Sequence, residues 1–326
     1  MRFIISSIAM LTISSISSQN VLGKEIERLS QLAQGTVGVA AMHLESREVF
    51  FQNADESYPM ASTYKVPIGV RLLQRVDSGE ISLNDMITIE PGDISPGWGT
   101  LLERIHRPGV KLSIINLLDM MLTYSDNAAT DICLKAAGGP YDVTQTLRNL
   151  GIKDIRVDRQ TLDIIADGLG VTDLPPRSEM DHTTFSKYQA KVSKIKEKEA
   201  YEAFKKDPRD QATPRDMLKL LTMIWKNEIL TPESNTLLRE IMLNCDTGVN
   251  RLKGKLPINT QVAHKTGTIG ISGNYSVNDV GVIYLPSNRG HVVIAVYIKN
   301  STAGHEVSES VIAEISRSIY DYFLYR

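Results

Sequence analysis

The stretch ASTYKVP places a serine and a lysine three residues apart, at Ser62 and Lys65, among small and apolar neighbours. On a helix, residues three apart lie on one face, so the two side chains can interact. A serine hydroxyl becomes a nucleophile when a base takes its proton, and a lysine can be that base when burial or a nearby cation lowers its pKa. A capping serine followed by an exposed lysine gives the same pattern, so the pair alone does not decide its own function.

Two further short segments carry groups that could act together with this pair. In YSDNAATD, Ser125 could relay a proton and the Asn127 amide could hold a substrate carbonyl, although Asp and Asn also favour helix N-caps. In HKTGT, Lys265 offers a positive charge for a carboxylate and can lower the pKa of another lysine. Gly267 lets the backbone approach a ligand closely, but an edge strand that ends in a turn has the same sequence.

Strand patterns lie at the two ends of the chain, and helical patterns lie between them. We predict helices at 24–35, 59–159 (interrupted by loops at 90–99 and 106–109), 213–230, 231–245 and 306–326, and strands at 36–45, 47–53, 261–268, 273–285 and 290–300. Strands linked as hairpins indicate an antiparallel sheet, and flanking helices can cover it. The expected fold class is therefore α/β (α+β), an antiparallel sheet flanked by helices with an inserted all-α lobe.

The expected α/β part covers about 24–58 and 215–326, and the all-α part covers about 59–214. A cleft between the two is a natural place for a site, and Trp98 either lines its rim or is an exposed aromatic side chain. The 326 residues can bury a sizeable core, and the net charge of -2 gives no general reason to bind nucleic acid or an anionic membrane. We expect a monomer with a small-molecule substrate and no cofactor. The scattered histidines and cysteines predict no metal site.

The N-terminus, MRFIISSIAMLTISSISSQNVLG, has one arginine, an apolar run and then a polar stretch that ends in small residues. This layout is typical of a secretory signal, and the apolar run is short for a membrane span. We predict cleavage near Gly23, with 17–19 as a second position, and a mature protein that is periplasmic or secreted. The two cysteines, Cys133 and Cys245, either form a disulfide or are buried thiols.

Taken in chain order, S-x-x-K, S-D-N and K-T-G resemble the motifs of class A β-lactamases and penicillin-binding proteins. The resemblance extends over nearly the whole mature length. VDR at 157–159 and RDQATP at 209–214 are similar to the two ends of that family's Ω loop, and NDVGVIYLP at 278–286 is similar to the strand that follows K-T-G. TGVNR, which ends at Arg251, resembles a variant in which the arginine helps to bind the substrate carboxylate.

The resemblance implies how the first two motifs share the chemistry of acyl transfer. Ser62 would be the nucleophile that becomes acylated, and Lys65 would be its activator or proton relay. Ser125 would pass a proton to the leaving nitrogen, and Asn127 would place the amide of the substrate side chain.

The third motif and the arginine would hold the substrate. Lys265, Thr266 and Arg251 would bind its carboxylate. The backbone N–H groups of Ser62 and Thr268 would form the oxyanion hole, in which single donors contribute about 3–4 kcal/mol in comparable enzymes.

The Ω loop departs from the family pattern, in which a glutamate within E-x-x-L-N activates the water that releases the acyl group. Counted forward from VDR, this position falls on Thr161, which cannot act as a base at neutral pH. Counted backward from PRD, it falls on Glu197 in EKEAY. The counts differ because Arg159 and Asp210, expected to form the structural ion pair of this loop, enclose 52 residues including themselves, so the loop carries an insertion.

Residues 187–210 are rich in Lys and Glu, which is typical of an amphipathic helix with a solvated outer face. We take Glu197 as the expected deacylation base, with Glu179, Glu199 and Glu202 as alternatives and an enzyme without such a base as a third possibility. The resemblance thus implies an exported class A-like β-lactamase that hydrolyses the β-lactam amide. The alternative is a penicillin-binding D,D-peptidase that acts on peptidoglycan peptides and releases β-lactams slowly.

Overall fold

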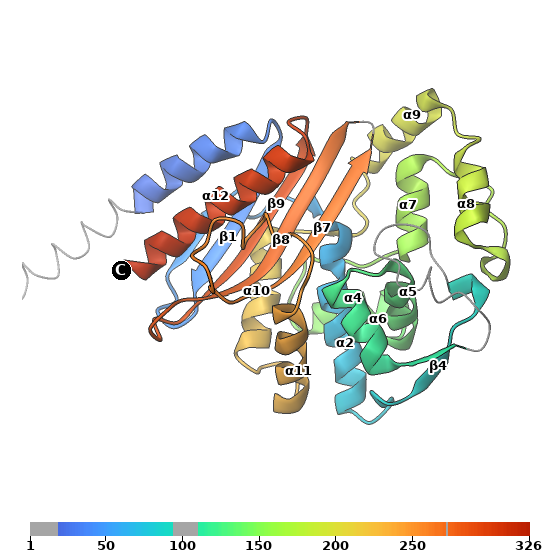
Figure 1. Ribbon diagram of the computed structural model, residues 1–326, viewed down its shortest axis with the longest axis horizontal. Coiled ribbons are helices and arrows are strands. Elements are labelled where there is room, and N and C mark those ends of the chain that lie inside the picture. The colour runs from blue at the N-terminus through green and yellow to red at the C-terminus, as the bar shows by residue number, and fades with distance from the viewer. Residues whose placement is uncertain (1–18, 94–109, 272) are drawn as a thin grey trace, which may run out of the picture.

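The computed structural model describes residues 19–93, 110–271 and 273–326. At its centre is a five-stranded sheet with the order β2-β1-β9-β8-β7, in which every neighbouring pair is antiparallel (Figure 1). The strands are β1 (Thr36–His43), β2 (Val49–Gln52), β7 (Val262–Ile271), β8 (Asn274–Tyr284) and β9 (His291–Ser301). Both ends of the chain therefore build one sheet, and the predicted antiparallel sheet flanked by helices is confirmed.

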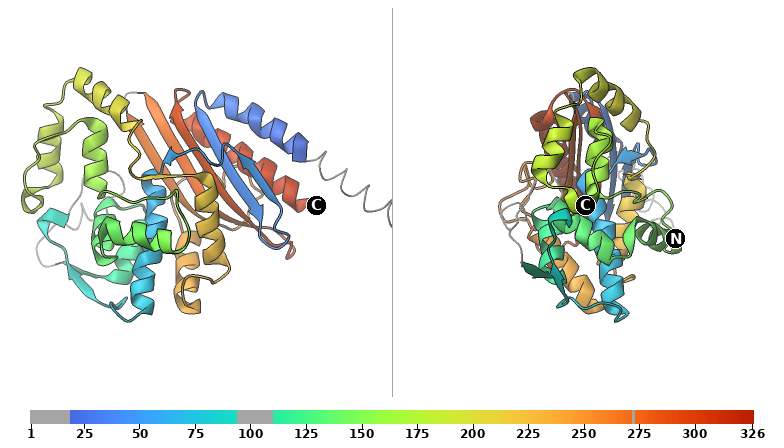
Figure 2. Two further views of the ribbon diagram at one scale, coloured as in Figure 1. Left: turned by 180° about the vertical axis from the view of Figure 1, so that it is seen from behind. Right: turned by 90° about the vertical axis from the view of Figure 1, so that its right-hand side faces the viewer.

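One face of this sheet is covered by two helices, which lie side by side in Figures 1 and 2. The first is helical over 19–32, and the second is α12 (His305–Leu324). Leu22, Ile26 and Leu29 recur at helical spacing and are buried in the core on this face. The chain begins and ends its packing on the same side of the sheet.

The first of these helices bears on the predicted signal peptide. Residues 1–18, which contain most of that signal, lie outside the described part of the chain. The helix runs through Gly23, and the buried Leu22 belongs to the core. Cleavage near Gly23 would remove Leu22 from that core, whereas cleavage at 17–19 would keep it. None of the helices in the described ranges is long and apolar enough to cross a membrane.

The other face of the sheet carries the helical lobe (Figure 2). Its helices are α2 (Lys65–Asp77), α4 (Ile114–Thr123), α5 (Asn127–Ala136), α6 (Gly139–Asn149), α10 (Pro214–Trp225), α11 (Pro232–Leu243) and the short 3₁₀ turns η1 (Ala61–Tyr64) and η2 (Pro91–Asp93). Thr213 and Thr231 cap α10 and α11, each followed by a proline in the first turn, a combination that defines where these helices begin. Trp98 lies outside the described residues.

Two short strand pairs complete this lobe. They are β3 (Tyr58–Pro59) with β6 (Gln211–Ala212), and β4 (Met86–Thr88) with β5 (Lys111–Ser113). The first pair joins the segment before Ser62 to the end of the Ω region. The entry to the nucleophile turn and the exit from the Ω region are therefore hydrogen-bonded to each other.

The Ω region folds as a helical subdomain. It contains α7 (Thr161–Leu169), η3 (Arg177–Glu179), α8 (His182–Gln189) and α9 (Lys194–Phe204), and a small core of its own made of Leu162, Ala166, Val171, Met180 and Phe185. The prediction of one helix over 187–210 is wrong in extent, because α8 ends at Gln189 and Ser193 caps a new helix. Ile195, an apolar residue of α9, is exposed.

Candidate active site

Ser62 lies in η1, where the helical lobe meets strand β7. The two are in close contact at Gly267, where an added Cβ would lie 2.5 Å from the carbonyl oxygen of Met60 and 3.1 Å from the Ser62 nitrogen. Asn278 on β8 donates its amide to the same Met60 oxygen at 3.1 Å. Ala61 adopts a φ of 47°, a left-handed conformation that costs a non-glycine residue free energy. The Ser62 N–H group is thus held beside the strand by contacts that only glycine permits.

Lys65 is the first residue of α2, and its side chain is fully buried. Its Nζ donates to the carbonyl oxygen of Ser125 at 2.7 Å, to Ser125 Oγ at 3.1 Å and to Asn127 Oδ1 at 3.0 Å. Burial lowers the pKa of Lys65 well below its usual range, and the charge of Lys265 lowers it further, although nearby carboxylates oppose both effects. The neutral amine, which can accept a proton, therefore forms at a lower pH than in an exposed lysine.

Ser125 and Asn127 flank the N-cap residue of α5. That residue, Asp126, caps the helix by accepting the N–H group of Ala129 at 2.8 Å. Ser125 has a φ of 60°, so the backbone turns sharply between α4 and α5. The motif therefore serves two purposes. Asp126 caps the helix, and its neighbours Ser125 and Asn127 contact Lys65.

Lys265 and Thr266 present the polar groups of β7. Lys265 is fully buried, and its Nζ donates to the Thr266 carbonyl oxygen at 3.0 Å. Burial lowers the pKa of Lys265 to about 8, against the opposing effects of Cys245 and Asp279. The Oγ1 atoms of Thr266 and Thr247 lie 2.6 Å apart. One cation and one hydroxyl group of β7 thus lie at one end of the site, together with the hydroxyl group of Thr247 from the loop after α11.

Arg251 is hydrogen-bonded to the strand at the same end of the site. Its guanidinium donates to Glu309 Oε1 at 2.9 Å, to the Gly267 carbonyl oxygen at 3.0 Å and to Thr268 Oγ1 at 2.6 Å. The side chain is buried, with only 4% of the residue exposed. Its bonds fix the end of β7 that carries the Thr268 N–H group, and its charge adds to that of Lys265.

These groups surround one cavity of about 720 Å³. The predicted residues that line it are Ser62, Ser125, Asn127, Arg251, Thr266, Gly267 and Thr268. The two lysines, Lys65 and Lys265, lie buried next to these residues rather than in the wall itself. The structure therefore brings the three motifs together around a space large enough for a small bicyclic substrate.

Thr161 also lines this cavity. Its Oγ1 lies 2.5 Å from the Tyr64 hydroxyl, and its N–H group donates to Asp131 Oδ1 at 2.6 Å. Burial raises the pKa of Tyr64 well above its usual range, and the charge of Asp131 adds to this effect, so the phenol stays protonated. Two neutral hydroxyl groups therefore lie at the residue on which the forward count from VDR places the family's glutamate.

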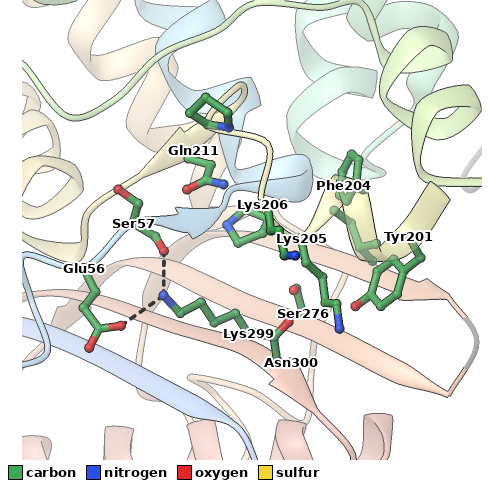
Figure 3. A pocket seen from close by; sticks show the side chains of 13 residues that line it. Glu56, Ser57, Tyr201, Phe204, Lys205, Lys206, Gln211, Ser276, Lys299 and Asn300 are labelled. Atoms are coloured by element: carbon green, nitrogen blue, oxygen red, sulfur yellow. Dashed lines mark hydrogen bonds and ion pairs between the residues drawn. The ribbon is translucent and has the colours of Figure 1, made fainter. Parts of the chain in front are cut away.

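Glu197 lies in α9 and does not line the cavity. The other end of α9 reaches the sheet, where Tyr201 and Phe204 line a separate cavity of about 400 Å³ (Figure 3). Glu197 precedes Phe204 by seven residues, so it lies about 10 Å farther along the helix. The helix is packed against the end of α7, where a Cβ at Gly170 would meet that of Ala200 at 2.8 Å.

The other candidate bases are also separated from the nucleophile. Glu179, Glu199 and Glu202 are exposed, and none of them lines the cavity. Among the described residues, the acidic side chains that do line it are Asp246, whose backbone N–H donates to the Thr123 carbonyl oxygen, and Glu309, which pairs with Arg251. The structure thus assembles the acylation groups and does not bring a predicted deacylation base to them.

Arg159 and Asp210 form a buried ion pair with 2.6 Å between Nε and Oδ2. Asp210 Oδ1 also accepts the N–H groups of Asp158 and Arg159, at 2.7 and 3.2 Å. The Arg159 Nη1 atom donates to Asp167 at 2.6 Å and to Asp207 at 3.1 Å. This network joins the two ends of the Ω subdomain.

Sequence reasoning missed several charged residues behind the site. His264 and Asp279 are fully buried, with Nδ1 2.9 Å from both carboxylate oxygens, and Glu309 of α12 supports Arg251. A titratable residue within each of two predicted strands was the available signal, because such positions are mostly apolar. Cys133 and Cys245 are both free thiols.

Comparisons with known proteins agree with this geometry. The sequence matches the family described as "Beta-lactamase enzyme family" over residues 21–323. It is 30% identical to the β-lactamase VEB-1 of Pseudomonas aeruginosa, over 92% of this chain and 89% of the relative. It is 29% identical to the extended-spectrum β-lactamase PER-1 of the same organism, over 98% and 94%.

Solved structures show the same likeness. The crystal structure of the TLA-1 extended-spectrum β-lactamase has a TM-score of 0.78 at 29% identity, covering 94% of this chain and 99% of that one. A β-lactamase from Chitinophaga pinensis DSM 2588 has a TM-score of 0.76 at 27% identity, covering 92% and 98%. The resemblance inferred from the motifs is therefore confirmed, and the chain belongs to the β-lactamase enzyme family.

Proposed function

We propose that this chain, a serine β-lactamase of class A type, opens the β-lactam amide by acylating Ser62. The observation that carries the proposal is the buried Lys65 ammonium, bonded to both Ser125 Oγ and Asn127 Oδ1 and three residues from Ser62. A buried lysine with a lowered pKa, held among hydroxyl groups at the wall of a cavity, is suited to proton transfer.

Acylation uses these groups in sequence. Neutral Lys65 takes the Ser62 proton, and Ser62 Oγ attacks the carbonyl carbon of the lactam. The oxyanion binds the N–H groups of Ser62 and Thr268, each worth about 3 kcal/mol in comparable sites. The C–N bond then breaks, and the proton passes from Lys65 through Ser125 to the leaving nitrogen.

Substrate binding uses the other end of the cavity. Lys265, with Thr266 beside it and Arg251 behind it, supplies positive charge and hydroxyl donors for the substrate carboxylate. The Asn127 side chain also lines the cavity, and its amide can hold the amide of the substrate side chain.

We propose that deacylation limits turnover. The family's base position holds Thr161, and Glu197 can activate water only if α9 moves toward the cavity. Among the described residues that line the cavity, the carboxylates are those of Asp246 and Glu309, and neither belongs to the Ω region. Water must therefore attack the acyl-enzyme with weak activation.

The same observation favours a second candidate function. A site that acylates well and deacylates slowly suits a D,D-peptidase, which takes its acyl group from a peptidoglycan stem peptide. Such an enzyme would use Ser62, Lys65 and Ser125 in the same roles and would hold β-lactams as long-lived adducts.

We further propose that the chain is exported, with cleavage at 17–19 rather than near Gly23. The apolar N-terminal run supports export. The burial of Leu22 supports the earlier cleavage position, since it keeps the whole helix over 19–32 in the folded enzyme. N-terminal sequencing of the exported protein tests both statements.

One experiment tests the catalytic proposal. Purified protein is mixed with a chromogenic cephalosporin, and turnover is followed together with the mass of the intact protein. We expect sustained turnover with a detectable adduct that maps to Ser62. A permanent adduct without turnover would favour the peptidase, and the absence of both would reject acylation of Ser62.

A further inference from the structure

Behind the Lys265–Thr266 segment lies a cluster that the proposed mechanism does not use. It consists of the thiol of Cys245, the imidazole of His264 and the carboxylate of Asp279, all at most 4% exposed. His264 Nδ1 lies 2.9 Å from each carboxylate oxygen of Asp279. His264 Nε2 is buried and makes no regular hydrogen bond within the described part of the chain. The ring interacts instead with the Cys245 thiol.

The charges in this cluster favour a thiolate. Burial opposes ionisation of the thiol, but the positive charges of His264 and Lys265 outweigh burial and lower the pKa of Cys245 to about 6. Burial also opposes charge on the imidazole, but Asp279 and Cys245 raise the pKa of His264 to about 9. Between these values the two groups form a thiolate–imidazolium pair. Burial raises the pKa of the other thiol, Cys133.

A second cavity lies against Cys245. This space has a volume of about 470 Å³, and Cys245 forms part of its wall. Asp119 and Asp246 also line it, together with Lys253, whose Nζ donates to the Cys245 carbonyl oxygen at 3.1 Å. Two carboxylates against one ammonium make the entrance unfavourable for anions.

The sulfur is connected to the substrate cavity on its other side. Cys245 Sγ lies 3.3 Å from Thr247 Oγ1, which lies 2.6 Å from Thr266 Oγ1. Thr247 and Thr266 both line the cavity that contains Ser62. Cys245 thus stands between the second cavity and the proposed carboxylate pocket.

We propose that Cys245 is a covalent modification site for small neutral or cationic disulfides, activated by His264 and Asp279. The Cys245 thiolate attacks one sulfur of the disulfide, the S–S bond of the reagent breaks, and its other half leaves as a thiolate. The product is a mixed disulfide on Cys245, and the reagent itself is the only oxidant. The attached group takes the place of the sulfur's contact with Thr247 and so disturbs Thr266. This last effect rests on the proposed function, whereas the modification does not.

Labelling of the folded protein tests the site. Cystamine, a dication, and dithiodipropionate, a dianion of similar size, are each added at pH 7.5, and the modified peptide is identified by mass spectrometry. We expect modification at Cys245 only, at least about tenfold faster with cystamine because of the acidic entrance. Labelling of Cys133 should require denaturant. Unmodified Cys245 after hours, or equal rates for the two reagents, would overturn the proposal.

Alkylation by uncharged iodoacetamide then distinguishes the activation of the Cys245 thiol from the accessibility of its sulfur to charged reagents. The alkylation rate of Cys245 should rise with a midpoint near pH 6, the pKa that His264 and Lys265 impose. In His264→Gln, which keeps a polar side chain but loses the charge, the midpoint should move upward by at least about one pH unit. An unchanged midpoint would show that His264 does not activate the thiol.

Activity provides the third measurement. Cystamine treatment should raise KM for a carboxylate-bearing cephalosporin about fivefold or more, leave kcat within about twofold, and be reversed by a thiol reductant. Cys245→Ser should be insensitive to cystamine, and the matched control Cys133→Ser should respond like the parent. A fully labelled protein with the parent KM would reject the coupling to Thr266. If the protein shows no turnover, labelling still decides the modification site, so the two failures remain distinct.

Discussion

The two halves of the catalytic apparatus are built in different ways. The predicted acylation groups lie in or next to the regular elements η1, α2, α5 and β7, and hydrogen bonds connect the helical lobe, and the turn before Ser62, to one another and to the sheet. The Ω subdomain has its own small core and is joined to the rest through the Arg159–Asp210 network. A region with a separate core can be lengthened without disturbing its neighbour, so acylation can persist while the deacylation position changes.

The largest effect is expected from the nucleophile. Ser62→Ala should lower kcat/KM by at least about 10⁴-fold, because no other described side chain occupies its place beside β7. Intact-protein mass spectrometry with a β-lactam should show no adduct. The thermal midpoint should stay within a few degrees of the parent, since Ser62 makes no packing contact that alanine would lose. An adduct on the alanine variant would contradict the assignment of Ser62 as the nucleophile.

The connection between the halves gives the next largest effect. Asp210→Asn removes one charge of a buried ion pair and should lower the free energy of unfolding by about 3 kcal/mol. Arg156→Ala is the control, because Arg156 pairs with the nearby Asp158 but 43% of its side chain is exposed, so the loss should stay below about 1 kcal/mol. Urea denaturation measures both.

The acylation rate of Asp210→Asn tests whether the two halves are independent units. If the Ω subdomain is a separate unit, the variant should still acylate Ser62 at a rate within about tenfold of the parent. A loss of acylation as large as that of Ser62→Ala would show that the two halves are one unit.

Sequence reasoning predicted the acylation half more completely than the Ω half for a physical reason. The three-residue spacing of Ser62 and Lys65 and the alternation in the strand that carries Lys265 are local patterns with a fixed geometry. The Ω half had two anchors, at Arg159 and Asp210, and no pattern that located the insertion between them. Residues 187–210 are dominated by Lys and Glu, so the few apolar residues gave a helical period without showing the break between α8 and α9.

The His264–Asp279 pair illustrates a second limit. Each residue lies in a strand of apolar neighbours, and only the β7–β8 register brings the two side chains together. That register pairs His264 with Gly281 and Thr266 with Asp279, which places His264 diagonally opposite Asp279, two residues along, on the same face of the sheet. A single sequence gives the strands but not their register, so the cluster becomes visible only in the folded chain.

Substitution of Thr161 tests the proposed deacylation position directly. Thr161→Glu places a carboxylate in the wall of the cavity and should shorten the lifetime of the acyl-enzyme by about tenfold or more, because a carboxylate can activate water. Thr161→Gln has the same length without the base and is the matched control. Time-resolved mass spectrometry measures the lifetime. If the two variants release the acyl group equally fast, Thr161 does not occupy the position of the base.

The pH dependence of acylation reports on the two buried lysines. Lys65 must be neutral to accept a proton, so kcat/KM should rise with pH as Lys65 is deprotonated, over a range well below that of an exposed lysine. Lys265 must be charged to bind a carboxylate, so kcat/KM should fall above about pH 8, by about tenfold for one pH unit. Lys265→Arg should move only the falling limb upward. A falling limb that stays in place would show that another group controls carboxylate binding.

The smallest effect is expected at Glu197. Substitution of this residue tests whether the Ω subdomain reaches Ser62 during turnover. In the structure Glu197 is outside the cavity wall, about 10 Å along α9 from the end that contacts the sheet. Glu197→Gln should therefore change the acyl-enzyme lifetime by less than about twofold, with Glu199→Gln as a matched control on the exposed face. A long-lived adduct in Glu197→Gln alone would mean that α9 moves and delivers this carboxylate to Ser62. The Ω subdomain would then be a mobile part of the catalytic site, and its separate core would permit that movement rather than isolate the subdomain from the chemistry.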